Sequence, residues 1–254
     1  MKTIKRILFI LLSERLFLAT LQRVYWAMYR AGLLKKSEVF KYHYFIQKVI
    51  QPTDYIVDIG ANLGYFSMPF SWLSRAGRVD AIEPLPMYAD ALKRVFKRNS
   101  RVFIHNIALG AMDGSVVMEL PYEQGVLRTG LPHIVSQPDA SCTEGRRLNV
   151  LMKRTDKFFK KFEKIDYLKC DVEGYEWEIF KSLEATLIRT RPVVQVEISG
   201  PNVANMCALM KKLGFAQYGL MQGRCVPDEV PQKSEGDFLF IPHEKEHLVS
   251  LWNN

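Results

Sequence analysis

Long apolar runs are missing from this chain of 254 residues. The uninterrupted apolar run near the N-terminus has only six members, from Ile7 to Leu12, and Ser13, Glu14 and Arg15 end it. A helix that spans a bilayer needs about 20 mostly apolar residues, and a secretory signal needs a longer apolar core before a cleavage site of small residues. A membrane span and a cleaved signal are therefore disfavoured.

Cysteines are also scarce: the chain has four, at positions 142, 170, 207 and 225. No two have C-x-x-C spacing and no paired histidines lie beside them, so neither a zinc site nor a disulfide framework is expected. Cys170 lies in an apolar, strand-like run that is typical of a buried small hydrophobe. This usage predicts a reducing, cytoplasmic location.

A charge excess is absent from most of the chain. Residues 1–50 carry ten Lys or Arg and two acidic residues, whereas the other 204 residues carry 25 of each sign. The net charge of +8 therefore belongs to the N-terminal segment. A balanced main domain argues against a nucleic-acid partner, because phosphate backbones select for clustered positive charge.

The N-terminal segment, Met1 to about Arg30, is predicted to be helical and basic. Aromatic residues (Tyr25, Trp26, Tyr29) alternate there with Arg and Lys, as in helices that lie on anionic membrane surfaces. A helix that packs on its own domain or on a second subunit fits the same pattern. The segment thus leaves open a peripheral position at the inner membrane surface, and the sequence does not define the oligomeric state.

After Pro52 the pattern changes to short apolar strands that alternate with amphipathic helices, which is typical of a doubly wound, mostly parallel α/β sheet. The expected division is a helical segment over 1–50 and a catalytic domain over 51–254. An irregular insert at 121–148 is expected to lie on the side of the acceptor substrate. Four predicted strands end at or near acidic residues: Asp58, Glu83, Asp171 and Glu197. Further strands are predicted over 101–109, 115–120, 215–221 and 237–241. Helices are predicted over 63–75, 86–99, 175–187 and 203–213, with Leu92, Val95 and Phe96 of the second helix facing inward.

The segment Asp58-Ile59-Gly60-Ala61-Asn62-Leu63-Gly64 is predicted to be a strand-to-helix turn. Gly60 allows a sharp turn and Gly64 a close approach, but the spacing G-x-x-x-G departs from the G-x-G-x-x-G of pyrophosphate sites. Glu83, at the end of the next strand, suits the two hydroxyls of an unphosphorylated ribose. An acid beside the turn suits a cationic amino-acid group, so S-adenosylmethionine fits better than NAD.

Several segments together resemble the FkbM family of class I methyltransferases. They are VDIGANLGYFS (57–67), AIEP (81–84), HNIALG (105–110), RTDKFF (154–159), KCDVEGYEWEIFKSL (169–183) and PVVQVEI (192–198), in the order of the family. The resemblance implies a Rossmann-like fold with a seven-stranded sheet, and methyl transfer to an oxygen, often a sugar hydroxyl. Cys170 replaces the usual Ile, and residues 121–148 have no clear family pattern.

The resemblance also assigns positions of the cofactor site. It implies that the methionine part of S-adenosylmethionine lies against the turn that follows Asp58. Glu83 would hold the ribose, and Asn106 or Ala108 would lie near the adenine. The full set of predicted cofactor-binding residues is Asp58, Gly60, Ala61, Asn62, Gly64, Tyr65, Glu83, Pro84, Asn106 and Ala108.

Transfer to a hydroxyl also needs a base, or a metal that lowers its pKa. Asp171 and Glu173 are the predicted catalytic residues, since alternate residues of an extended segment share one side. The alternative is that Asp171 only binds amides or the cofactor while Glu173 caps the next helix. Two carboxylates are fewer ligands than a divalent cation usually takes, so no metal ligand is assigned. His105, His133, Asp156 and Glu197 remain secondary candidates.

The leading hypothesis is therefore S-adenosylmethionine-dependent O-methylation of a small-molecule or glycan acceptor, in a polysaccharide, glycolipid or natural-product pathway. The alternatives are an N-directed or RNA-directed methyltransferase, a non-catalytic cofactor-binding protein, and an NAD-dependent oxidoreductase.

Overall fold

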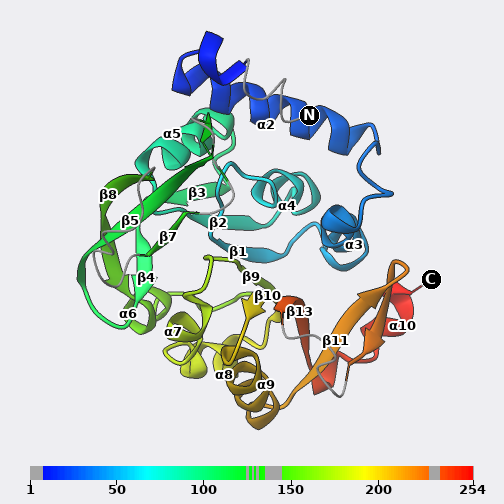
Figure 1. The fold of residues 1–254 in the computed structure, drawn as a ribbon. Coiled ribbons are helices and arrows are strands. Elements are labelled where there is room, and N and C mark those ends of the chain that lie inside the picture. Colours follow the sequence, from blue (N-terminus) through cyan, green and yellow to red (C-terminus); the bar gives the residue numbers. More distant parts are fainter. Residues whose placement is uncertain are drawn as a thin grey trace.

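A computed structural model describes residues 8–123, 126–127, 129, 132–134, 145–228 and 235–253 of the protein. Within these residues, eight strands form the central sheet. Five central strands are parallel, and β13 is antiparallel to both of its neighbours (Figure 1). In spatial order the strands are β12 (Arg224–Pro227), β11 (Phe215–Met221), β13 (Glu235–Pro242), β10 (Val193–Ser199), β9 (Tyr167–Cys170), β1 (Tyr55–Ile59), β2 (Arg78–Ile82) and β3 (Val102–His105).

Helices cover both faces of this sheet, as the alternation of strands and helices predicts. One face packs on α3 (Lys41–Val49), α4 (Ser67–Leu73) and α10 (Leu248–Trp252). The other face packs on α6 (Thr155–Phe159), α7 (Glu176–Phe180), α8 (Glu184–Thr190) and α9 (Asn202–Lys212). Along β1 the side chains alternate between the two cores: Ile56 joins the first and Val57 the second.

A second, smaller sheet is built from the segment that follows β3. Its strands are β4 (Ala108–Gly110), β8 (Gly145–Arg154), β5 (Gly114–Glu123), β6 (Val126–Leu127) and β7 (His133–Ile134), with β5 and β8 paired antiparallel over eight residue pairs. The predicted insert at 121–148 thus begins and ends inside strands. Cys142 and residues 135–144 lie outside the described residues.

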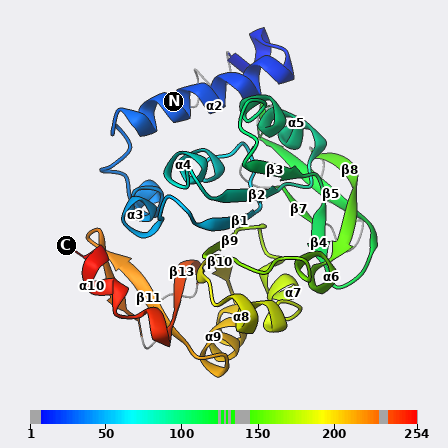
Figure 2. The ribbon, with the colours of Figure 1, turned by 180° about the vertical axis from the view of Figure 1, so that it is seen from behind.

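The N-terminal helix packs on its own domain. Helix α2 (Glu14–Arg30) lies across α5 (Pro86–Val95), as Figure 2 shows from behind, and it buries Phe17, Leu18, Tyr25 and Tyr29. It is not continuous with the helical turn at 8–11, because Ser13 caps its N-terminus by accepting a hydrogen bond from the Leu16 amide. Among the described residues, no helix is long and apolar enough to cross a membrane.

Several predicted boundaries were wrong for local reasons. The helix expected from Leu63 starts only at Ser67, because Gly60, Asn62 and Gly64 adopt left-handed backbone conformations in the turn before it. Pro69 is the third residue of α4, where a missing amide hydrogen costs nothing. The helix expected over 175–187 is two helices, α7 and α8, since the chain tightens to i→i+3 hydrogen bonds at 182–183.

Other errors concern strands and facing. The strand expected over 101–109 is two strands in different sheets, separated at Asn106, and Val95 is exposed rather than inward. Strand β12 was missed because its hairpin turns on Gln222 and Gly223, which both have positive φ, and glutamine is an uncommon residue for that conformation. The strands at 215–221 and 237–241 and the helix at 203–213 are found within two residues of their predicted bounds.

Candidate functional site

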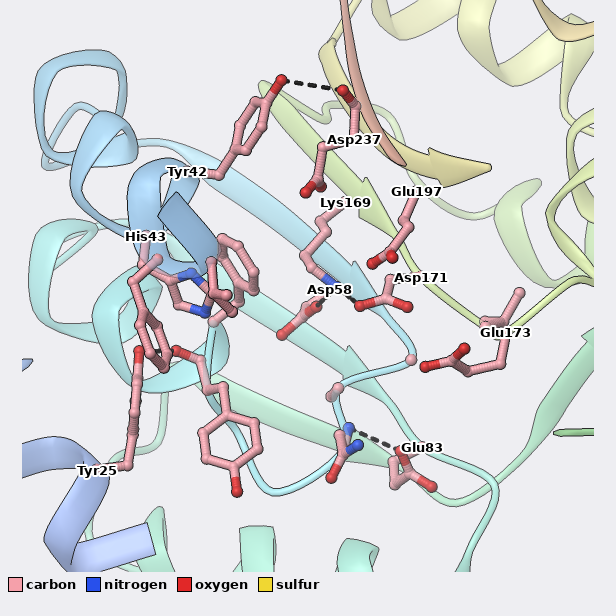
Figure 3. Close-up of a pocket in the computed structure, with 18 of the residues that line it drawn as sticks. Tyr25, Tyr42, His43, Asp58, Glu83, Lys169, Asp171, Glu173, Glu197 and Asp237 are labelled. Carbon is pink, nitrogen blue, oxygen red and sulfur yellow. Dashed lines mark hydrogen bonds and ion pairs between the residues drawn. The ribbon is translucent and has the colours of Figure 1, made fainter. Parts of the chain in front are cut away.

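A pocket of about 520 Å³ opens beyond the carboxyl ends of β1, β2, β9 and β10, where ligands of doubly wound sheets bind. Figure 3 shows acidic side chains from these strand ends around one space, with Tyr25 and His43 of the N-terminal helices at its side. The predicted residues that line it are Asp58, Gly60, Ala61, Asn62, Tyr65, Glu83, Pro84, Asp171 and Glu173.

The turn after β1 forms the floor of the pocket. Gly60 has φ +80°, and a β-carbon added there would lie 1.7 Å from the Asp171 carbonyl oxygen and 3.3 Å from Val172. No side chain fits between the two loops, so the backbone of β1 and β9 meets directly under the ligand space. The amides of Gly60 and Ala61 both donate to the Ile82 carbonyl, which ties the turn to β2.

Asp58 is buried at the start of this turn, with 1% of its surface exposed. Its Oδ2 accepts a hydrogen bond from the Ser67 hydroxyl at 2.6 Å, while Oδ1 has no hydrogen-bond partner among the described residues. The Lys169 ammonium is 3.9 Å from that Oδ1. Burial raises the pKa of Asp58 although Lys169 and Ser67 oppose the shift. A cationic ligand group would satisfy this oxygen.

Glu83 lies across the turn from Asp58 and is 4% exposed. Its two oxygens accept hydrogen bonds from the Asn62 amide at 2.7 Å and the Leu85 amide at 2.8 Å. Burial raises the pKa of Glu83 to about 7, against the effect of these two amides. Each carboxylate oxygen keeps further lone pairs, so both can still accept hydrogen bonds from a ligand.

Lys169 is a buried cation that the sequence analysis missed. Its ammonium is 3.1 Å from Asp171 Oδ2 and lies 4.8 Å from the centre of the Phe66 ring. Burial acts to lower the pKa of Lys169, but Asp171 and Asp58 outweigh burial and the pKa is raised. Lys169 is on β9 and Asp171 directly follows that strand, two residues later, so strand alternation would have placed both on one side.

Glu173 extends into the pocket from a strained turn. Its φ of +55° is rare for a residue with a side chain, and Gly174 after it has φ +101°. The segment is therefore not extended, so the predicted reason for the convergence of Asp171 and Glu173 was wrong even though both line the pocket. Desolvation and the nearby carboxylates of Asp171 and Glu176 raise the pKa of Glu173 to about 7.

The alternative prediction, that Glu173 caps the next helix, was wrong. The α7 helix begins after Tyr175, which makes no side-chain cap, and Glu176 takes the loop amides instead. Its Oε1 accepts hydrogen bonds from Val172 at 3.0 Å and Gly174 at 3.1 Å. Glu176 therefore holds the turn, which leaves the Glu173 carboxylate directed at the pocket (Figure 3).

Two further acidic residues line the pocket. Glu197 of β10 and Asp237 of β13 line the pocket next to Lys169 and Asp171 (Figure 3). Desolvation and the carboxylates of Asp171 and Asp237 raise the pKa of Glu197 to about 7. Asp237 accepts from the Gln195 amide at 2.7 Å, and it comes from a strand that the motif-based reasoning did not connect to the site.

Three predicted cofactor residues do not line the pocket. Gly64 backs the turn, where an added β-carbon would lie 2.8 Å from Leu92. The Asn106 side chain donates to the carbonyls of Glu83 at 2.9 Å and Pro84 at 2.8 Å, so it shapes the β2 end from behind. Ala108 is buried in the core beside α2 and α5.

Of the secondary candidates, Glu197 lines the pocket and the other three lie elsewhere. His105, on β3, lies 2.7 Å from Asp80 and does not line the pocket. Asp156, in the first turn of α6, pairs with Arg154 on the surface and does not line the pocket. His133 is exposed on β7 and does not line the pocket. No group of three or more His, Cys, Asp or Glu within the described ranges is arranged to hold a metal ion.

Comparison with known proteins gives the family. The sequence profile of the methyltransferase FkbM domain matches residues 58–216. The chain belongs to this family. Among curated proteins it is similar to methyltransferase sdnD of Sordaria araneosa, with 27% identity over 214 residues, which is 70% of this chain and 80% of that protein.

Among solved structures, the FkbM-type fold of this chain is similar to methyltransferase FkbM from Methylobacillus flagellatus, with a TM-score of 0.50 and 15% identity. The match covers 75% of this chain but 44% of the solved one, so this chain spans less than half of that structure. The sheet order β3-β2-β1-β9-β10-β13-β11 has the seven strands that the resemblance implies, and β12 is added at its edge. The predicted family and fold class are confirmed.

Proposed function

We propose that this FkbM-type protein uses S-adenosylmethionine to methylate a hydroxyl oxygen of a sugar or another small molecule. The observation that carries the proposal is the Asp58 Oδ1 atom, which is buried and lacks a hydrogen-bond partner at a bare glycine turn. A buried carboxylate oxygen without a hydrogen bond is costly. The Lys169 ammonium forms an ion pair with Oδ1 at 3.9 Å, which is too long for a hydrogen bond, and an ammonium group of a ligand would donate one. An anionic ligand group has no proton to donate to it.

The other polar residues at the strand ends fit the same cofactor. Glu83 offers two acceptor oxygens at the distance along the chain where a ribose diol is held in related sheets. Gly60 leaves the backbone bare beneath the ligand. When bound, S-adenosylmethionine supplies an electrophilic methyl carbon on a sulfonium centre. The protein must then hold the acceptor oxygen in line with that carbon and remove its proton.

Glu173 is the best placed general base in the pocket. Asp171 already accepts a hydrogen bond from the Lys169 ammonium, which reduces its availability for a substrate proton. The Glu173 carboxylate forms no hydrogen bond or ion pair with the described residues, and its pKa of about 7 matches the range in which a base is both ionised and strong enough. In this role Glu173 accepts the hydroxyl proton, while the ion pair of Lys169 and Asp171 holds the end of β9 in place beside the turn after β1.

Calorimetry tests the cofactor directly. S-adenosylhomocysteine should bind the wild-type protein, and NAD should not, because the site presents carboxylates rather than amides to a diphosphate. Glu83→Ala should weaken S-adenosylhomocysteine at least tenfold, since hydrogen bonds to a charged group contribute about 1.5–3 kcal/mol each. Asp90→Ala, an exposed acid on α5, is the control. Tight NAD binding without a response to S-adenosylhomocysteine would refute the proposal.

A further inference from the structure

The pocket has a second part that the cofactor chemistry does not explain. Its side chains come from α2, from η1 (Glu38–Phe40) and from the loop between them, and all but one are purely apolar. This apolar wall consists of Leu21, Val24, Tyr25, Met28, Leu34, Val39 and Phe40. It shares one continuous space with the carboxylates at the strand ends.

The wall has little capacity left for hydrogen bonds. The Tyr25 hydroxyl, its one polar side-chain group, already donates to the Tyr65 carbonyl at 2.6 Å. Next to the wall, the Tyr42 hydroxyl donates to the Asp237 carbonyl at 3.0 Å. A free sugar placed against these side chains would lose its hydration without replacement, which costs free energy for each buried hydroxyl.

The outer edge of the wall is exposed. Val24 is 51% exposed and Val39 is 78% exposed, although both line the pocket. Apolar surface that faces water gains about 25 cal/mol per Å² when a ligand covers it. An entrance with such side chains favours a ligand that carries its own apolar surface.

The wall also lies outside the family match. The matched region begins at residue 58, whereas every wall residue precedes residue 41. Its chemistry is therefore a feature of this chain's N-terminal helices rather than of the shared domain. S-adenosylmethionine, with its charged groups and ribose, needs no entrance of exposed aliphatic side chains.

We propose that the apolar wall binds the apolar portion of an amphipathic acceptor, whose hydroxyl-bearing head reaches Glu173. This inference rests on the proposed function, because it places the acceptor in the same pocket as the methyl donor. The required ligand chemistry is an alkyl, terpenoid or similar apolar body joined to a hydroxylated head. Such a molecule is either a soluble natural product or a membrane lipid.

Alkyl β-D-glucosides test the wall by their chain length. Hexyl to nonyl glucosides, below their micelle concentrations, should bind the protein saturated with S-adenosylhomocysteine about fourfold more tightly for each added methylene, whereas glucose should bind weakly. In the double variant Val24→Asp, Val39→Asp this dependence should largely disappear. Ile188→Asp, on α8 and 54% exposed, is the matched control and should keep it. The affinity for S-adenosylhomocysteine should be the same in all variants.

A glucosyl diacylglycerol in phosphatidylcholine vesicles separates the two sources: binding of the monomeric glucosides alone assigns a soluble acceptor, and binding of the vesicle probe assigns a lipid. Affinities independent of chain length would overturn the inference. So would a parallel loss of S-adenosylhomocysteine in the double variant, which would give the wall to the cofactor. If the wild type binds the glucosides by chain length but not S-adenosylhomocysteine, the proposed function fails and the apolar site stands.

Discussion

At the scale of single residues, the pocket brings together acids whose protonation differs from that of ordinary surface acids. Glu83 is buried, whereas Glu173 and Glu197 keep exposed surface. Desolvation, together with neighbouring carboxylates, raises the pKa of each to about 7. Three carboxyls with such values titrate where enzymes need both proton acceptors and neutral groups. Their contacts differ: backbone amides hold Glu83, whereas Glu173, at the strained turn, has no hydrogen bond to its carboxylate from the part of the chain that the structure describes.

The pH dependence of methyl transfer follows from Glu173. Only its ionised form accepts a proton, so turnover should rise with pH and level off above about 7. Glu173→Gln keeps the shape but not the basicity, and turnover should fall by about 10²–10⁴-fold. Rates with a hydroxyl acceptor found by screening, together with calorimetric binding of S-adenosylhomocysteine, measure this.

The control for that experiment is Asp156→Asn, since Asp156 belongs to a family motif but lies outside the pocket. It should leave both the rate and its pH profile unchanged. If Glu173→Gln retains wild-type turnover, or loses it only by losing the cofactor, Glu173 is not the base.

Gly60 allows a sharp test of the turn. Gly60→Ala places a methyl group 1.7 Å from the Asp171 carbonyl oxygen, so β1 and β9 must separate. Gly223→Ala is the matched control, because its φ of +75° is similar to the +80° of Gly60 and nothing lies within 4 Å. Urea denaturation should show a loss of about 1–2 kcal/mol for the control, from left-handed backbone strain alone, and a clearly larger loss for Gly60→Ala. Equal losses would mean that the close approach does not exist.

At the scale of elements, α2 decides what covers the pocket. Its buried Phe17 and Leu18 pack on α5 and the second sheet, and two side-chain hydrogen bonds fasten it to the turn after β1. One of these comes from Gln22, which is 3% exposed and donates to the Leu63 carbonyl at 2.9 Å. The helix therefore touches the same loop that bears the predicted cofactor residues.

Removal of that hydrogen bond should loosen the helix. Gln22→Ala leaves the buried Leu63 carbonyl unpaired, and the free energy of unfolding should fall by about 1–3 kcal/mol. The neighbouring Arg23 is exposed, so Arg23→Ala should change it by less than about 0.5 kcal/mol. Urea denaturation of the two variants compares them. Identical stabilities would show that α2 is not docked on the domain in solution.

The two helices α7 and α8 show how one local conflict limits prediction. The apolar pattern over 175–187 continues through both, and the sequence therefore favours one helix. The chain instead tightens at residues 182–183 and starts again at Glu184. Periodicity reports which side chains face the core, but not whether the backbone hydrogen bonds run without a break.

At the scale of the whole molecule, the charge asymmetry is a surface property of one end. The N-terminal bases Arg15, Arg23 and Lys36 are exposed, and so are the apolar side chains of Ile10, Leu11 and Leu16. Removal of residues 1–30 would strip buried core residues, so it cannot report on membranes alone. The proposal of peripheral membrane association needs substitutions that keep the fold.

Vesicle sedimentation with charge variants provides that test. Wild-type protein should sediment with vesicles that contain phosphatidylserine and less with pure phosphatidylcholine, in a salt-dependent way. Each base near the surface contributes about 1 kcal/mol, so the N-terminal triple variant should bind about a hundredfold more weakly. The variants are Arg15→Gln, Arg23→Gln, Lys36→Gln and the control Lys97→Gln, Arg98→Gln, Lys211→Gln, all at exposed positions. Equal weakening by the control would refute a specific N-terminal surface.

What the sequence by itself determined is the order of strands and helices, the family and the acids at the strand ends. Parallel strands carry their signal in short local runs, and strand-end residues share an edge whatever the rest of the chain does. Asp58, Glu83 and Asp171 could therefore be assigned to one pocket from the sequence. Glu173 also lines it, but its prediction assumed an extended backbone that the turn does not have. Gly64, Asn106 and Ala108 were predicted with them but do not line the pocket, because a motif does not say which of its residues only supports the others.

Only the tertiary structure decided what closes the pocket and how its charges balance. The ion pair of Lys169 with Asp58 and the position of Asp237 in the pocket depend on packing between segments more than 50 residues apart in the chain. The strain at Glu173 depends on a backbone angle. The apolar wall depends on the position of α2 across the β1 turn, and an amphipathic helix has the same sequence pattern whether it faces a membrane, a partner or its own domain. Burial of its apolar face by this domain is a long-range contact, which local sequence cannot specify.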